Sequence, residues 1–220
     1  MYLKGYNRNI KKSGPKECEK MVKEQGYKST IKSRPLLFLE TKKVSSLLYQ
    51  GFKEFEVKEK AIVENIFQVN TESRKKEIAS SVLARLKILD EYLIREIGHG
   101  DIESSKAIVL YAIMKTDRLF FEFMNEVFKE KFVFREAFLT DADFNIFFEH
   151  KQQQSEKVAS WNDYTFYKLK QVYIRILFEA GYLKNQKGNR EIERPLLNID
   201  VVEHIRASGD GIYMDILVGE

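Results

Sequence analysis

The side chains most often used in catalysis and metal binding are few and scattered in this chain of 220 residues. The three histidines, His99, His150 and His204, are isolated, with no second histidine at metal-ligand spacing. The single Cys18 excludes a disulfide scaffold and a zinc cluster built on several thiolates. There is no serine in a nucleophile elbow and no glycine-rich phosphate loop. We therefore expect a protein that is not an enzyme and holds neither a cofactor nor a metal.

Binding chemistry is better represented, because three clusters combine basic and hydroxyl side chains. The first cluster holds Lys28, Ser29, Thr30, Lys32 and Arg34, with no acidic residue among them. Such a segment can follow phosphates or enter a minor groove as an arm. A solvated leader is the alternative interpretation.

The second cluster, Ser73, Arg74, Lys75 and Lys76, lies in the first turns of a predicted helix. The helix before it and the break between the two suggest a helix-turn-helix. In that motif the N-terminal residues of the second helix contact DNA. The basic residues oppose the helix dipole, so a role in stability is not favoured.

The third cluster lies on a long predicted C-terminal helix and the hairpin that follows it. It comprises Thr165, Tyr167, Lys168, Lys170 and Arg175 on the helix, and Lys184, Lys187, Arg190 and Arg194 around the hairpin. Positions 164, 167, 168 and 171 share one helical face. Winged helices also serve as protein-interaction modules, so this arrangement alone does not decide between DNA and a protein partner.

The net charge of +4 is unevenly distributed along the chain. Residues 1–34 carry +7, residues 35–100 carry +1, residues 101–150 carry −4, residues 151–195 carry +4 and residues 196–220 carry −4. Two basic blocks separated by an acidic one suggest an anionic partner. A lysine-rich solvated surface explains the same charges, and both interpretations stay open.

Long spans without glycine or proline predict the helices that must position these clusters. Residues 52–97 and 101–180 contain neither residue type. We expect helices over residues 36–49, 54–65 and 71–89, the third capped by Asn70 or Thr71. Asp90 can cap a short helix, Asp101 a long helix or helix pair reaching residue 131, and Thr140 with Asp143 a helix to residue 153.

The last third of the chain predicts a winged helix-turn-helix. A short helix at 156–160, which Ser155 can cap, is followed by a turn and a long helix ending at Gly181. A hairpin over residues 182–194, a short helix capped by Asn198 and a strand at 212–218 come next. We expect Trp161 and Tyr173 to belong to the core.

The predicted fold is mainly α, with a helical bundle in the N-terminal lobe and a winged helix-turn-helix with a short β-hairpin in the C-terminal lobe. The predicted units are a basic arm (1–34), a bundle with a helix-turn-helix-like element (35–135) and a winged-helix domain (136–220). The longest apolar runs, at 107–114 and 132–138, fall far below the roughly 20 residues needed to cross a bilayer. The first residues do not form a secretory signal, so we expect a cytoplasmic protein without a membrane partner.

Several stretches of the chain resemble the BrxA family of bacteriophage exclusion (BREX) defence systems. They span about residues 25–200 in order and register, and they lie at residues 27–37, 40–44, 64–68, 73–74, 85–86, 115–120, 161–165, 168–172, 179–183 and 194–197. No single motif is diagnostic, but their order and spacing together make the resemblance fairly specific.

The resemblance implies a cytoplasmic, mostly helical, non-enzymatic protein encoded beside a methyltransferase and ATPases. It implies a role in restricting phage and binding to double-stranded DNA through helix-turn-helix-like parts. RNA is not excluded, because the family has also been compared with a helical RNA-binding antitermination factor. A protein-interaction subunit that docks other BREX proteins is the competing hypothesis.

Overall fold

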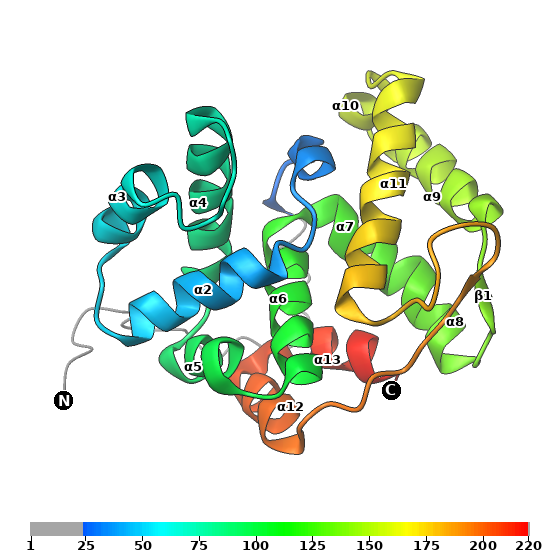
Figure 1. The fold of residues 1–220 in the computed structure, drawn as a ribbon. Coiled ribbons are helices and arrows are strands. Elements are labelled where there is room, and N and C mark those ends of the chain that lie inside the picture. The colour runs from blue at the N-terminus through cyan, green and yellow to red at the C-terminus, as the bar shows by residue number, and fades with distance from the viewer. Residues whose placement is uncertain (1–23, 220) are drawn as a thin grey trace.

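The computed structural model describes residues 24–219, and within them the chain is mainly helical (Figure 1). The first part contains η1 (Thr30–Ser33), α2 (Phe38–Tyr49), α3 (Glu54–Val63), α4 (Glu72–Leu86), α5 (Glu91–His99) and α6 (Ile102–Thr116). The middle contains α7 (Arg118–Phe123), the π-helical turn η2 (Met124–Phe128), α8 (Lys129–Val133), β1 (Phe138–Leu139) and α9 (Asp141–Gln154). The last part contains α10 (Glu156–Ala159), α11 (Asp163–Ala180), β2 (Arg190–Glu191), α12 (Ile199–Ile205), the π-helical turn η3 (Arg206–Asp210) and α13 (Gly211–Val218).

Local capping signals place most helix starts, as the sequence predicts. Thr71 accepts a hydrogen bond from the backbone N–H of Arg74 at 3.3 Å, and Asp90 accepts one from Leu93 at 2.9 Å. The other caps found as predicted are Asp101, Thr140 with Asp143, Ser155 and Asn198. Gly181 ends α11 at a φ of 88°, a conformation that glycine adopts without strain.

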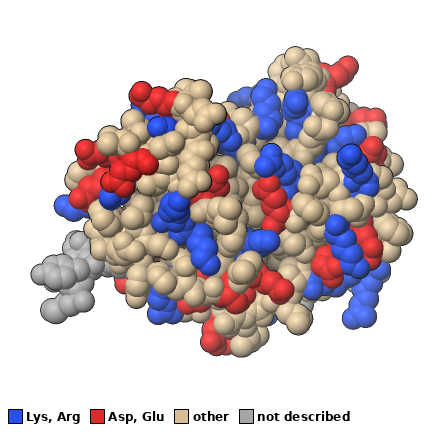
Figure 2. Space-filling model, viewed as in Figure 1, with Lys and Arg blue, Asp and Glu red and all other residues tan. Residues whose placement is uncertain are grey.

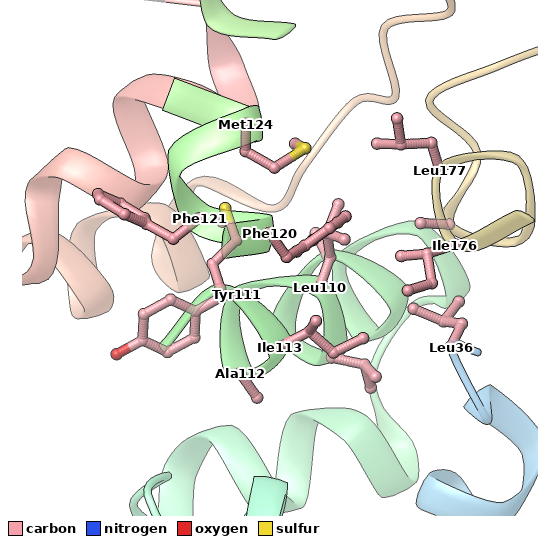
Figure 3. Close-up of a cluster of buried hydrophobic side chains, with 14 of the residues drawn as sticks. Leu36, Leu110, Tyr111, Ala112, Ile113, Phe120, Phe121, Met124, Ile176 and Leu177 are labelled. Carbon is pink, nitrogen blue, oxygen red and sulfur yellow. The ribbon is translucent and has the colours of Figure 1, made fainter. Parts of the chain in front are cut away.

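Helix α6 lies in the middle of the molecule and is buried on nearly all sides. Its residues from Ala107 to Met114 are all buried. Helices α2, α4 and α5 pack on it from one part of the chain, and α7, α11 and α13 from the other. Figure 3 shows Leu110 and Ile113 of α6 beside Leu36, Phe120 of α7 and Ile176 of α11. The buried apolar side chains form one continuous cluster, which also holds Tyr173 and receives the half-buried Trp161 at its edge, as expected.

The helical stretch predicted from residue 101 to 131 is divided at Asp117. This residue is extended, with φ −132° and ψ 106°, and its carboxylate accepts a hydrogen bond from the N–H of Phe120 at 2.9 Å. Asp117 therefore ends α6 and caps α7, and η2 then leads into α8. The sequence predicts one long helix or a pair of helices here, and the structure confirms the pair.

The strand predicted at residues 212–218 is wrong, because this segment is helix α13. Ile212, Tyr213, Met214, Ile216 and Leu217 are all buried, so the apolar residues cover several faces of the helix. A short run that is apolar on every side carries no period that separates a strand from a helix.

A short two-stranded sheet joins the segment before α9 to the segment after α11. β1 pairs antiparallel with β2, with Phe138 opposite Glu191 and Leu139 opposite Arg190. On the other edge of β2, the predicted hairpin is present as a bridge between Leu183 and Ile192. β2, which follows α11 in the chain, is thereby tied to β1, which precedes α9.

The predicted basic arm is described only from residue 24, and residues 1–23 with Cys18 lie outside the described range. Residues 24–34 lie against the body. Tyr27 and Ile31 are 7% and 4% exposed and belong to the hydrophobic core. The division into three units stays a prediction.

Candidate nucleic-acid interface

Two buried anchors hold the first basic cluster between α4 and α11. Ile31 packs into the core, and η1 contacts α11. The hydroxyl of Tyr27 donates to Glu122 at 2.9 Å, and the guanidinium of Arg118 lies 4.1 Å from the centre of the Tyr27 ring. Between and beside these anchors, Lys28, Thr30 and Lys32 are exposed. The anchoring leaves the two lysines facing solvent from a fixed backbone.

Glu122 is the centre of a charged network that connects this segment to α9. Lys151 of α9 is 3% exposed, and its ammonium contacts Glu122 at 2.9 Å and Glu126 at 2.6 Å. Burial acts to raise the pKa of Glu122, but hydrogen bonds from Arg118 and Lys151 outweigh it and lower that pKa. Burial, with the hydrogen bond to Glu122, raises the pKa of Tyr27 to about 12.

The second cluster is joined directly to the first. Arg74 donates to the backbone carbonyl of Ser33 at 3.1 Å and to Glu77 at 2.7 Å, and the hydroxyl of Ser33 donates to Glu77 at 2.8 Å. Lys75 donates to the carbonyl of Ile62 at 3.1 Å. Most basic groups of this cluster therefore hold the fold together as well as carrying charge.

Arg85 fixes the C-terminal end of the basic segment, residues 24–34. Its guanidinium, 5% exposed, donates to the carbonyls of Arg34, Pro35 and Leu36 at 2.9, 3.0 and 2.7 Å. Burial lowers the pKa of Arg85 to about 10, and the nearby positive charge of Arg34 adds to this effect. This interaction ties the chain just after the first cluster to α4, which carries the second.

The third cluster is divided between structural and exposed side chains. Thr165 is buried, and its hydroxyl donates to Asn162, the N-cap residue of α11. Arg190 is also buried and pairs with Asp141 at 2.8 Å, while Lys170 lies 3.5 Å from the same carboxylate. Lys168 is half-buried on α11, and Lys187 is exposed at the hairpin.

The structure brings the first and second clusters together and places α11 of the third beside them. Figure 2 shows Lys and Arg gathered over the upper middle of this face, where η1 lies near α11. Acidic side chains gather over α3 and along the lower edge, over α5 and α12. Within residues 24–219, Lys28, Lys32, Lys168 and Lys187 form no salt bridge. Lys187 belongs to the hairpin rather than to η1 or α4.

Sequence reasoning named Tyr167 and the helical face that carries it, but it missed one basic residue of this surface. Lys157 of α10 lies beside the basic segment, since its ammonium would be 3.9 Å from a β-carbon on Gly26. Tyr164 and Tyr167 on α11 are 63% and 49% exposed. The shared helical face of positions 164 and 167 is a signal for the tyrosines, whereas no local pattern indicates the position of Lys157.

Among the described residues, no group of three or more His, Cys, Asp or Glu side chains is placed to hold a metal ion. No helix within residues 24–219 has the length and apolar character needed to cross a membrane.

Comparison with known proteins identifies the family. The model of the BrxA family matches residues 25–209 of this chain. The chain belongs to the BrxA family. A BREX protein BrxA from Bacillus cereus (strain H3081.97) is 94% identical over 200 residues, which cover 91% of this chain and 100% of that protein. This BrxA-family chain is thereby placed among the proteins of BREX phage-defence systems, as the sequence resemblance implies.

More distant relatives carry the same family name. A BREX protein BrxA from Paramagnetospirillum magneticum (strain ATCC 700264 / AMB-1) is 24% identical over 85% of this BrxA-family chain and 94% of its own length. A crystal structure of an uncharacterized protein from Magnetospirillum magneticum superposes with a TM-score of 0.74 at 23% identity, covering 88% of this chain and 99% of that one. This likeness shows the fold.

Proposed function

We propose that this BrxA-family protein is a non-enzymatic, cytoplasmic component of a BREX phage-defence system that binds double-stranded DNA mainly through phosphate contacts. The observation that carries the proposal is the union of two basic clusters into one surface beside α11. Arg74 and Arg85 hold the backbone of residues 33–36, and the Tyr27–Glu122 hydrogen bond holds the chain just before Lys28. Lys28 and Lys32 are thus presented as free cations from a rigid support.

The fixed positions of Lys28 and Lys32 matter because phosphate contacts fix the register of a protein on DNA. Cations at set positions release counterions on binding without first ordering a flexible segment. Thr165 and Arg190 are left out of the proposed contact surface because both are buried. Ser29, Thr30, Arg34 and Ser73 lie in or beside the joined clusters and remain proposed phosphate contacts.

We interpret the C-terminal region as a winged helix-turn-helix. Its supporting features are the order α9, α10, α11 and hairpin, and the pairing of β2 with both β1 and the chain after α11. In this interpretation α11 is the recognition helix and Lys187 lies on the wing. The first two turns of α11, residues 163–169, contain no Asn, Gln or Arg that could read bases, so binding with weak sequence preference is expected.

The test compares two doubly neutralised variants. Lys28→Gln with Lys32→Gln removes two cations from the proposed surface. Lys58→Gln with Lys87→Gln removes two exposed cations from α3 and the end of α4, giving the same net charge. Affinity for a blunt duplex is measured by fluorescence anisotropy over a range of salt concentrations, and thermal unfolding checks the fold.

We expect the first variant to bind more weakly and to lower the slope of log affinity against log salt by roughly 2, because each phosphate contact contributes roughly 0.9. The control variant keeps most of the affinity and the slope. Equal effects of the two variants would contradict the proposed surface, and no binding by the unmodified protein at low salt would contradict DNA binding. Structured RNA, added as a competitor, decides between the two nucleic acids.

A specific observation favours a second candidate, a subunit that docks other BREX proteins. Leu196, Ile199 and Ile102 are 87%, 62% and 60% exposed. The chain around Leu196 lies at the start of α6, because the N–H of Leu196 donates to Glu103 at 3.0 Å. Large apolar side chains exposed in one region mark a site for a partner. Leu196→Ser with Ile199→Ser should then impair assembly of the defence complex while DNA binding persists, as measured by co-purification and anisotropy.

A further inference from the structure

Tyr164 and Tyr167 are exposed to solvent on the face of α11 that points away from the core. The rings of Tyr164 and Tyr167 lie 6.4 Å apart at an interplanar angle of 29°. The ammonium of Lys168 lies 5.3 Å from the centre of the Tyr164 ring and 5.8 Å from that of Tyr167. Gln171 donates to the hydroxyl of Tyr167 at 2.8 Å. The opposite face of α11 is buried, so the helix holds both rings in place.

A groove between α9 and α11 lies next to these rings. Its volume is about 270 Å³, and Phe148, Phe166 and Tyr167 supply aromatic walls. Glu149 and Asp163 line it as well, and an ionised carboxylate can only accept hydrogen bonds. The rest of the polar lining is Asn145 and Gln152, whose amides can donate or accept, and Lys170, which also lies 3.5 Å from Asp141. The groove thus combines flat apolar walls with two charged acceptors, and these carboxylates suit a planar group that carries an amino substituent.

We propose that Tyr164, Tyr167 and this groove bind unpaired nucleobases, so that the protein prefers DNA in which a single-stranded stretch interrupts a duplex. The inference rests on the proposed function and names the DNA that this part of the surface takes. In an intact duplex the base faces are covered by their neighbours, and side chains reach only the base edges. Aromatic rings bind bases by stacking once the faces are free.

Charge favours a nucleic acid as the occupant of this surface. Lys168 lies over both rings and forms no salt bridge within residues 24–219, so it is available to a phosphate between stacked bases. η1, which carries Lys32, contacts α11, the helix that carries both tyrosines. A strand leaving the duplex on the lysines would pass the rings.

The groove also sets the class of base. Cytosine and adenine carry exocyclic amino groups that donate to carboxylates, whereas thymine presents carbonyl oxygens at the corresponding positions. Glu149 and Asp163 should therefore favour unpaired cytosine or adenine over unpaired thymine.

The experiment uses the full chain and three labelled DNAs of equal length: a blunt duplex, the same duplex with a short gap exposing cytosines, and one exposing thymines. Affinities are measured by anisotropy for the unmodified protein, for Tyr164→Ala with Tyr167→Ala, and for Tyr164→Phe with Tyr167→Phe. Tyr49→Ala removes another exposed tyrosine, from α2, and is the matched control. Thermal unfolding shows that each variant is folded.

We expect the unmodified protein to bind the cytosine gap most tightly. The double alanine variant should lose roughly tenfold in affinity for gapped DNA, the effect of one lost stacking contact, and little for the blunt duplex. The double phenylalanine variant keeps its rings and should retain the preference, as should Tyr49→Ala.

Three results would overturn the inference and leave duplex binding intact: equal affinity for blunt and gapped DNA, equal affinity for the cytosine and thymine gaps, or equal losses by the alanine variant on all DNAs. If the alanine variant binds every DNA normally but no longer assembles with other defence proteins, the rings bind a protein and the inference is wrong. Loss of all DNA binding by the unmodified protein would instead overturn the proposed function itself.

Discussion

Arg85 holds the basic segment through backbone carbonyls rather than through an opposite charge. No salt bridge to Arg85 occurs among residues 24–219, and its guanidinium is occupied by the carbonyls of Arg34, Pro35 and Leu36. The planar fork of arginine is suited to several acceptors at once, which a lysine ammonium is not. This one side chain therefore sets where the segment that carries Lys28 and Lys32 meets α4.

Replacing Arg85 should destabilise the protein strongly. Arg85→Ala leaves buried carbonyls without donors, each costing about 1–3 kcal/mol, so the free energy of unfolding should fall by about 3 kcal/mol in urea denaturation. Arg85→Lys should give an intermediate loss. Arg95→Ala, which removes an exposed arginine paired with neighbouring Glu96, is the control and should change little. A loss in Arg85→Ala no larger than that of the control would show that the clamp contributes little.

At the scale of elements, sequence predicts best where the determinants are local. Asp90 and Asp101 stand next to the helices they cap, and Gly181 directly follows α11, so each boundary can be found within a few residues. The strand predicted at 212–218 fails because burial on several faces of α13 comes from the rest of the fold. The Tyr27–Glu122 contact joins residues 95 positions apart, so no local pattern can indicate it.

The break between α6 and α7 shows how a local signal can be hidden in an apolar stretch. Asp117 is a normal N-cap, but it follows α6 without a glycine or proline, and the surrounding residues continue a helical pattern. Burial raises the pKa of Asp117 to about 6, against the opposing effects of the Phe120 N–H and the positive Arg85. Asp117, which marks the boundary between α6 and α7, is therefore also a group with a shifted pKa.

Asp117→Asn should reveal this titration in stability. The folded-state pKa lies above the value near 3.9 of an exposed aspartate, so the folded protein binds the proton more tightly. The contribution of Asp117 is therefore most favourable below about pH 4 and is lost as pH rises through about 6. Asparagine caps equally well without titrating. The stability of the unmodified protein minus that of the variant should fall by about 2 kcal/mol between pH 4 and pH 7, as measured by urea denaturation.

The same substitution at Asp101, the exposed N-cap of α6, provides the reference for the cap itself. A difference between the unmodified protein and Asp117→Asn that stays constant over this pH range would contradict the raised pKa. A difference that rises with pH would mean that positive neighbours such as Arg85 outweigh burial.

At the scale of the molecule, contacts cross the boundary between the predicted bundle unit (35–135) and the predicted winged-helix unit (136–220) at several points. Asp90 meets His204 at 2.6 Å, and Lys115 meets Asp210 at 2.6 Å. The hydroxyl of Tyr111 also donates to Asp210, at 2.5 Å. The hydrophobic cluster runs from the first helices to α13. These contacts bear on function, because the proposed DNA surface needs α4, η1 and α11 at fixed separations.

We therefore expect residues 35–135 and 136–220 to unfold together. Trp161 is the only tryptophan in the chain, and it packs at the edge of the core in the second of these units, so its fluorescence reports on that unit, whereas circular dichroism follows all helices. In urea the two signals should change at the same midpoint, since one continuous core unfolds in a single cooperative step. Asp210→Asn, which weakens the contacts to Lys115 and Tyr111, should lower both midpoints together. Fluorescence that changes at lower urea than circular dichroism would show a separately folding C-terminal unit. The spacing of α11 from η1 would then depend on DNA rather than on the protein.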